Sequence, residues 1–268
     1  MAPSMGDVAQ NLEVWNKTWD WSRRGDEWSD WWGGTSAEWF GALLPRIHTY
    51  VPTGTILEIA PGYGRWTQYL KDLCDRLVVV DLAERCIDHC RERFASASNI
   101  EYHVNDGRSL DMVADESVDF VFSFDSLVHA EIDVLAAYLD QLARKLKPHG
   151  VGFAHHSNAG AYPVLVNLAL RTPDRLRRPL IEKGVFPDLY AWRATSVTAE
   201  SFASQCEVAG LACIAQEKIN WGRGIYLTDV LSVFTRRGSR WERARRVRRN
   251  PFFRWEARRM AALYANRS

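Results

Sequence analysis

Long apolar runs are missing from this 268-residue chain. No stretch approaches the roughly 18 to 20 consecutive apolar residues that a transmembrane helix needs. The opening, "MAPSMGDVAQ", also lacks the basic start and the apolar core of a secretory signal. We therefore expect a soluble cytoplasmic protein. With 47% hydrophobic residues, the chain is long enough for one sizeable α/β domain.

Cysteine is also scarce, and its five residues are odd in number. Cys86 and Cys90 form a C-x3-C pair on an expected helix, but no second pair follows at the spacing of a zinc ribbon. We interpret all five cysteines as free thiols in a reducing compartment.

Charge and tryptophan are unevenly distributed. Residues 236–268 hold twelve arginines against two glutamates, a balance of +10, which leaves −9 for the rest of a chain whose net charge is +1. We expect a basic helical tail that docks on the acidic body or on a second subunit, so a homodimer is one expectation. Seven of the twelve tryptophans lie before residue 40, in a segment that we interpret as a helical cap over residues 1–50.

Short β-branched runs alternate with amphipathic stretches through the centre of the chain. Such βαβ alternation predicts a mostly parallel sheet with helices on both faces and ligands beyond the carboxyl ends of the strands. The expected strands are 55–60, 77–81, 100–104, 118–124, 151–155, 211–219 and 226–236, and the expected helices are 65–73, 84–94, 133–146 and 198–210. The main domain then covers residues 51–235, with a lid-like insertion at 159–195.

A glycine loop follows the first expected strand, in "ILEIAPGYGRW". Gly62 and Gly64 allow a ligand to approach the backbone at a helix N-terminus. A dinucleotide fingerprint G-x-G-x-x-G requires a third glycine where Thr67 stands, so NAD is the less favoured ligand. Asp81 ends the second strand, where a carboxylate can accept hydrogen bonds from both hydroxyls of a ribose.

These motifs together resemble a class I S-adenosylmethionine-dependent methyltransferase with a Rossmann-like, seven-stranded sheet. The resemblance rests on Glu58-x-x-x-Gly62-x-Gly64, Asp81, Asp106-Gly107, "VDFVFSFDSLVHAE" and "LARKLKPHG", and covers roughly residues 40–235. It implies that Glu58 lies near the methionine ammonium, that Asp81 binds the ribose and that Asp106 binds the adenine amino group. The implied cofactor-binding set is Glu58, Ala60, Gly62, Gly64, Trp66, Asp81, Leu82, Asp106, Gly107 and Phe124.

Each member of this set also has a purely structural interpretation. Glu58 can support the loop, Asp81 can cap a strand end, and Asp106-Gly107 can form a turn, because D-G is common turn chemistry. The combination in this order and spacing favours the cofactor.

An acceptor hydroxyl of high pKa needs a base within hydrogen-bond reach. His129 after the fourth strand and His155-His156 at the end of the fifth are candidates, because imidazole titrates near neutrality. We name His129, His156 and Asp125 as candidate catalytic residues. His129 can equally be a structural histidine at the start of a helix, and either residue of the pair can be a packing residue.

Magnesium is held by carboxylates in some methyltransferases of this kind. Asp125 is available, but His155, His156, Ser157 and Asn158 follow where a second acid is expected, so we do not favour a metal.

The acceptor follows from a weaker resemblance. "DEWSDWWGG" and "AWRATSVTAESF" resemble actinobacterial O-methyltransferases of sugars, glycolipids or methylated polysaccharides. Aromatic rings pack against the apolar faces of sugars, which suits a sugar acceptor. Separately, the insertion "RTPDRLRRPLIEK" is basic with apolar neighbours, which suits a membrane-surface or dimer contact. Candidate acceptor-binding residues are Trp32, Tyr162, Tyr190 and Arg193.

Other functions remain open. The arginine tail suits a nucleic-acid methyltransferase, but "FDSLVH" is unlike the N/D-P-P-Y/F motif of base-amino methyltransferases, so nucleic acid is not favoured. A small natural product as acceptor, a cofactor-binding protein without turnover and an NAD-dependent oxidoreductase are the remaining alternatives.

Overall fold

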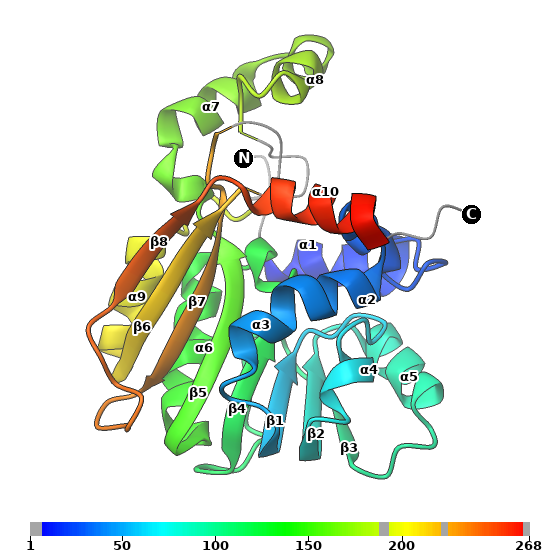
Figure 1. Cartoon of the computed structure of the whole chain (residues 1–268), viewed down its shortest axis with the longest axis vertical. Coiled ribbons are helices and arrows are strands. Elements are labelled where there is room, and N and C mark those ends of the chain that lie inside the picture. Colours follow the sequence, from blue (N-terminus) through cyan, green and yellow to red (C-terminus); the bar gives the residue numbers. More distant parts are fainter. Residues whose placement is uncertain (1–6, 188–192, 221–224, 265–268) are drawn as a thin grey trace.

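The computed structural model describes residues 7–187, 193–220 and 225–264. One eight-stranded sheet runs through it in the order β3-β2-β1-β4-β5-β7-β6-β8 (Figure 1). The strands are β1 (Thr53–Ile59), β2 (Cys74–Asp81), β3 (Ile100–Val104), β4 (Val118–Ser123), β5 (Leu146–Ser157), β6 (Leu211–Ile219), β7 (Asp229–Arg236) and β8 (Arg246–Asn250).

The first five strands are parallel, whereas β7 runs antiparallel to both β5 and β6. The predicted Rossmann-like fold is therefore confirmed, with eight strands in the described sheet where seven were predicted. The predicted strands 100–104 and 211–219 have the observed bounds, and the other strands differ by a few residues at their ends.

Helices cover both faces of the sheet. α6 (Ile132–Lys145) and α9 (Ala199–Val208) pack on one face, and α5 (Glu84–Arg93), α4 (Thr67–Leu70) and the N-terminal segment pack on the other. Alternation along β1 shows why: Leu57 belongs to the core under α6, and Ile56 belongs to the core on the opposite face. The helix predicted at 65–73 is only one turn, because the chain enters β2 at Cys74.

The N-terminal segment is helical, as predicted, but irregular. It comprises α1 (Val8–Glu13), a π-helix at Val14–Thr18, a 3-10 helix at Asp26–Trp32, α2 (Thr35–Glu38), a second π-helix at Trp39–Leu43 and α3 (Leu44–Ile47). Trp39, Leu43 and Ile47 are buried against the sheet. The part from α1 to the 3-10 helix reaches the carboxyl ends of the strands.

The tail differs from the prediction of a continuous helix. Residues Arg246–Asn250 form the edge strand β8, which pairs parallel to β6, and only Phe253–Tyr264 form a helix, α10. Pro251 separates the two. Proline has no backbone N–H to donate to a neighbouring strand, and it suits a position just before a helix. An edge strand with exposed arginines has no apolar alternation, so hydrophobic pattern cannot reveal it.

The insertion after β5 is helical. It contains α7 (Pro163–Arg171) and α8 (Asp174–Glu182), which extend away from the sheet at the edge where the parallel strands end (Figure 1). Thr198 caps α9 in a capping box with Ser201, at the start of the helix predicted over 198–210.

Candidate active site

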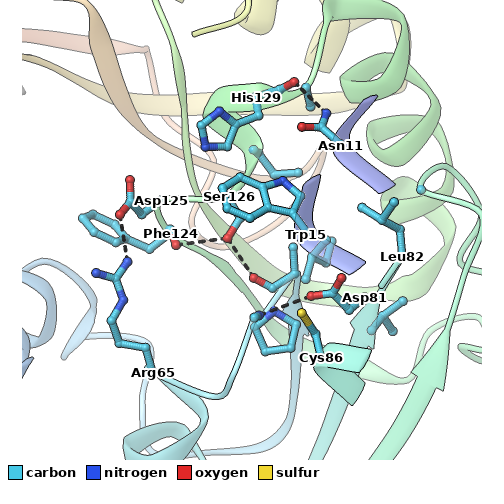
Figure 2. A pocket seen from close by; sticks show the side chains of 18 of the residues that line it. Asn11, Trp15, Arg65, Asp81, Leu82, Cys86, Phe124, Asp125, Ser126 and His129 are labelled. Carbon is cyan, nitrogen blue, oxygen red and sulfur yellow. Dashed lines mark hydrogen bonds and ion pairs between the residues drawn. The ribbon is translucent and has the colours of Figure 1, made fainter. Parts of the chain in front are cut away.

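A pocket lies beyond the carboxyl ends of β1, β2 and β4, where an α/β sheet of this kind binds ligands (Figure 2). Inside the pocket, the space open to the centre of a water-sized sphere is about 90 Å³, and the empty space reaches about 900 Å³ when the open mouth is included. Its walls come from the loops after these strands and from the N-terminal segment, which contributes Trp15, Trp21 and Trp28. A largely apolar pocket with a few polar groups therefore occupies the position predicted from the strand order.

The glycine loop forms the floor of this pocket. After β1, Ala60, Gly62 and Gly64 all have positive φ, of 58°, 58° and 81°. A Cβ on Gly62 would come within 2.9 Å of the Trp21 ring, so this glycine allows close approach on the pocket side. A Cβ on Gly64 would instead meet Phe94 at 2.5 Å, and Gly64 is not among the pocket-lining residues. Gly62 therefore serves the pocket, and Gly64 serves the packing against α5.

Asp81 braces the loop and lines the pocket. One carboxylate oxygen accepts a hydrogen bond from the Gly62 amide at 3.2 Å, and the other accepts from the Ala83 amide at 2.8 Å. Burial raises the pKa of Asp81 to about 6, although these amide hydrogen bonds oppose the shift. Each carboxylate oxygen keeps a second lone pair for a hydroxyl of a ligand, which fits the predicted ribose contact.

Glu58 lies below the loop and is not among the pocket-lining residues. It is 1% exposed, and its Oε2 accepts a hydrogen bond of 2.6 Å from the Thr67 hydroxyl, while Oε1 has no hydrogen-bond partner among the described residues. Burial raises the pKa of Glu58 to about 8. The structure thus gives Glu58 the geometry of a loop support and does not place it beside the pocket.

Asp106 and Gly107 separate in the structure. The Asp106 carboxylate is exposed and accepts hydrogen bonds from the amides of Arg108 and Ser109, which is the geometry of a turn cap. Gly107 does line the pocket, and a Cβ there would meet Val8 at 2.9 Å. The remaining predicted cofactor neighbours also line it: Ala60, Trp66, Leu82 and Phe124.

Asp125 reaches the pocket from the loop after β4, with a positive φ of 62°. Its carboxylate pairs with Arg65 at 2.8 Å (Figure 2). Arg65 is 4% exposed, and its guanidinium lies 5.1 Å from the Trp28 ring and 4.5 Å from the Trp66 ring. Arg65 was not among the predicted site residues, although a charged residue directly after the glycine loop is itself a signal.

Two buried carboxyls therefore share the surroundings of Arg65. Glu38 lies 4.0 Å from the guanidinium and is fully buried. Its burial raises its pKa to about 7, and the charge of Arg65 limits the rise. Arg65 thus carries the positive charge that balances Asp125 at this wall of the pocket.

His129 ends a short 3-10 helix (Leu127–His129) and lines the pocket. Its ring centroid is 5.3 Å from that of Trp15, and its backbone carbonyl accepts a hydrogen bond from Asn11 (Figure 2). The N-terminal segment therefore contacts both the ring and the backbone of this candidate base.

His156 lies elsewhere. It is fully buried, its Nδ1 donates to the Ser157 carbonyl and its Nε2 accepts from the Ser232 hydroxyl, each at 2.8 Å. Its ring stacks on Phe202 at 4.1 Å, and burial lowers its pKa to about 3. His156 is thus a neutral packing residue away from the pocket lining.

His155 lies directly behind the pocket wall. Its Nδ1 accepts the Asp125 amide at 3.1 Å, and its Nε2 lies 3.2 Å from Asp229. Arg193 donates two hydrogen bonds of 2.8 Å to the same Asp229 carboxylate. Burial alone would raise the pKa of Asp229, but the Arg193 charge and the His155 hydrogen bond hold it well below its usual range.

The predicted acceptor-binding residues do not gather at the pocket. Trp32 is buried and packs edge-on against Phe253, and Arg193 is buried on Asp229. The Tyr162 hydroxyl accepts a hydrogen bond from the Leu227 amide, and Tyr190 lies outside the described residues. Trp15, Trp21 and Trp28 line the pocket instead, and the crowding of tryptophans before residue 40 was the signal for them.

Within the described residues, no group of three histidine, cysteine, aspartate or glutamate side chains has the arrangement of a metal site. None of the helices in that same part of the chain has the length and apolar character to cross a membrane.

Known proteins share parts of this architecture. Residues 56–150 match the family described as "Methyltransferase domain". Phosphoethanolamine N-methyltransferase 1 of Caenorhabditis elegans is 28% identical over 110 residues, which are 41% of this chain and 22% of that protein. The match thus spans about a fifth of that relative.

Solved structures extend the similarity over most of the chain. N-methyltransferase NodS from Bradyrhizobium japonicum, in complex with S-adenosyl-l-homocysteine, is 18% identical with a TM-score of 0.54, covering 86% of this chain and 98% of its own. The DhpI-SAM-HEP complex is 18% identical with a TM-score of 0.53, covering 85% and 97%. The chain has the class I methyltransferase fold.

This result confirms the predicted fold, within which residues 56–150 match the methyltransferase-domain family. The same comparisons support S-adenosylmethionine as the cofactor. At these levels of identity they do not identify the acceptor.

Proposed function

We propose that this chain is an S-adenosylmethionine-dependent O-methyltransferase that acts on a hydroxyl of a sugar, glycan or glycolipid. One observation carries the proposal: His129 and Asp125 line the same pocket as Gly62 and Asp81. A candidate base therefore faces the groups that the class I fold uses for its cofactor, which is the arrangement that methyl transfer to a hydroxyl needs.

The residues of the pocket fit the cofactor. Asp81 offers a carboxylate to the ribose hydroxyls, and Gly62 and Gly107 have no side chain where a Cβ would enter the space against Trp21 and Val8. Ala60, Leu82 and Phe124 supply apolar surface. When bound, S-adenosylmethionine supplies an electrophilic methyl group on a sulfonium. We assign Asp106 no direct contact, because its carboxylate caps a turn outside the pocket lining.

The role of His129 is to accept the proton of the acceptor hydroxyl. Trp15 packs against its ring and Asn11 holds its backbone, so the imidazole has a defined position. Asp125, fixed by Arg65, contributes a second acceptor to the pocket lining. The Trp15, Trp21 and Trp28 rings offer flat apolar faces, which suit the apolar face of a sugar ring.

An amine acceptor is the second candidate. The curated relative and one of the solved structures are both named N-methyltransferases. An amine loses a proton on methylation as a hydroxyl does, so His129 would serve either acceptor. The identity of the methylated atom thus has to be measured.

We further propose a cytoplasmic location and a three-part organisation: residues 1–50 as a cap, 51–235 as the methyltransferase unit and 236–268 as a basic tail. The cap proposal is supported by the contacts of Trp15 and Trp21 at the pocket. A homodimer remains a proposal for measurement in solution.

The first experiment is calorimetric titration of the purified chain with S-adenosylhomocysteine and, separately, NAD. We expect binding of the first alone, and a loss of affinity of at least about tenfold in Asp81→Asn, which is about 1.4 kcal/mol. Glu101→Gln, at an exposed ion pair on β3, is the matched control and should bind normally. NAD binding, or no binding of either compound, would overturn the cofactor assignment.

The acceptor is tested next with methyl-labelled S-adenosylmethionine and mixtures of sugars, glycolipids and amines. Mass spectrometry and NMR of the labelled product identify the methylated atom. A label on oxygen supports the proposal, whereas a label on nitrogen selects the second candidate.

A further inference from the structure

The insertion after β5 forms a helical hairpin, α7 (Pro163–Arg171) and α8 (Asp174–Glu182), that extends away from the sheet (Figure 1). The two helices have a small core of their own, made by Val166, Ala169, Ile181 and Phe186 together with Ala159.

Several large apolar side chains of the hairpin remain in solvent. Val164 is 77% exposed, Leu168 53% and Leu176 55%, and Leu170 and Val185 are also exposed. On α7, Val164 and Leu168 are one helical turn apart, on the side opposite to Val166 and Ala169. An exposed apolar set on one projecting element marks an interaction surface, because isolated surface residues do not group in this way.

The polar residues around this surface are mainly cationic. Between Pro163 and Val185 the sequence has five basic residues and two acidic ones, Asp174 and Glu182, a balance of +3. Among the five, the exposed residues are Arg171, Arg175, Arg178 and Lys183. Apolar side chains interleaved with arginines are the pattern of a helix that lies in a membrane interface, where the cations meet lipid phosphates and the apolar groups enter the acyl boundary.

We propose that the α7–α8 hairpin docks on an anionic lipid bilayer. The charge of the surface selects this occupant, since a positive, apolar surface is complementary to acidic headgroups above acyl chains. Two hydrogen bonds join the hairpin to the segment that precedes β7. Tyr226 donates a hydrogen bond to the Val185 carbonyl, and the Leu227 amide donates to the Tyr162 hydroxyl. Binding of the hairpin to a bilayer would therefore also hold the rest of the fold at the bilayer.

Docking would also orient the molecule. Residues 226 and 227 lead into β7, whose first residue, Asp229, binds the His155 that supports Asp125 at the pocket. The hairpin therefore leaves the sheet at the edge where the pocket lies, so this edge would face the bilayer. The proposal concerns where the chain binds and does not depend on which acceptor it methylates.

The test is sedimentation of the full-length protein with sucrose-loaded vesicles. One set of vesicles contains phosphatidylcholine alone, and the other contains in addition about 30% phosphatidylserine as the anionic lipid. We expect at least about tenfold stronger partitioning onto the anionic vesicles, weakened by high salt. The double variants Leu168→Asp/Leu176→Asp and Arg171→Glu/Arg175→Glu should each lose about tenfold in partitioning. Val208→Asp is the matched control, because Val208 is 79% exposed on α9, and it should bind as the wild type does.

Thermal unfolding and S-adenosylhomocysteine titration of each variant show whether it is folded, so a loss of vesicle binding alone is diagnostic. Failure of the wild type to prefer anionic vesicles overturns the proposal. Equal binding of wild type and hairpin variants also overturns it, because attachment would then arise elsewhere, such as in the arginine tail. Sedimentation that shows a dimer split by the hairpin variants assigns the surface to a second copy instead.

Discussion

The side chain of His155 holds the backbone of Asp125: the Asp125 amide donates to Nδ1 of His155 at 3.1 Å. Because Nδ1 accepts this bond, the proton of the neutral ring is on Nε2, which faces Asp229 at 3.2 Å. Asp125 has a left-handed backbone conformation, which costs energy in a non-glycine residue. A buried set of side chains behind the pocket thus stabilises a strained residue on its wall.

Asp229→Asn should destabilise the fold by about 3–5 kcal/mol, because it removes the negative member of a fully buried ion pair with Arg193. Denaturant unfolding with a constant m-value measures this loss. The control is Glu101→Gln, which breaks the exposed pair with Arg76 and should cost no more than about 1 kcal/mol. Equal stability of the two variants would contradict the buried network.

Glu58→Gln should stabilise the protein increasingly as the pH rises. Burial raises the pKa of Glu58 from 4.5 to about 8, so the folded state binds the proton more tightly than the unfolded state does. The wild type consequently loses stability as pH increases between these values, and the loss is complete above about pH 8. The variant lacks this penalty, which is on the order of a few kcal/mol.

Unfolding measured at pH 5 and at pH 9 tests this difference. Glu101, whose pKa the hydrogen bond from Arg76 lowers, is the control site, and its Gln variant should gain nothing at high pH. A Glu58→Gln variant whose advantage is the same at both pH values would show that Glu58 is ionised throughout.

Much of the fold could be predicted from sequence because hydrophobic periodicity determines the sheet. β3 and β6 have the predicted bounds, and α9 begins within the helix predicted over 198–210, where Thr198 and Ser201 form its cap. The eighth strand could not be predicted, because Arg246–Asn250 pairs through its backbone alone at a sheet edge and its side chains are mostly exposed. A run of arginines looks the same in a helix and in an edge strand.

Of the candidate site, too, only some residues could be predicted from the sequence. Gly62 and Asp81 could be predicted because their places in the sequence define them: Gly62 lies in the loop just after the first predicted strand, and Asp81 is the last residue of the second. The tryptophans could not be sorted: Trp32 is buried against α10, whereas Trp15 and Trp21 reach the pocket. They lie in or beside π-helical and 3-10 segments, where a 3.6-residue period does not predict which side chain faces inward.

His129→Gln should lower kcat by about 100-fold or more while it leaves S-adenosylhomocysteine affinity within about twofold. Glutamine keeps the size and hydrogen bonding of the side chain but cannot take a proton, and general-base catalysis contributes about 10²–10⁴-fold. Steady-state rates with the identified acceptor, together with calorimetry, separate the two effects. His48→Gln, at an exposed histidine between α3 and β1 that does not line the pocket, is the control. An unchanged kcat would remove His129 from the mechanism.

Gly62→Ala should weaken S-adenosylhomocysteine binding by about tenfold or more, in addition to destabilising the fold. Its φ of 58° is costly for alanine by about 1–2 kcal/mol, and the new Cβ would lie 2.9 Å from the Trp21 ring. That ring cannot yield easily, because it stacks on Tyr63 at 4.5 Å and its Nε1 donates to the Trp15 carbonyl at 3.0 Å.

Gly210→Ala separates backbone strain from crowding at the pocket. Gly210 has a φ of 79°, but nothing lies within 4 Å of a Cβ built there, so alanine should cost the same strain without an effect on binding. In a Trp21→Ala background, Gly62→Ala should cost less stability than it does in the wild type, because the clash is with that ring. If both glycine variants bind S-adenosylhomocysteine equally well, the approach of a ligand to Gly62 is not what this loop provides. A selective loss in Gly62→Ala would instead tie the left-handed loop, and the tryptophan above it, to the cofactor.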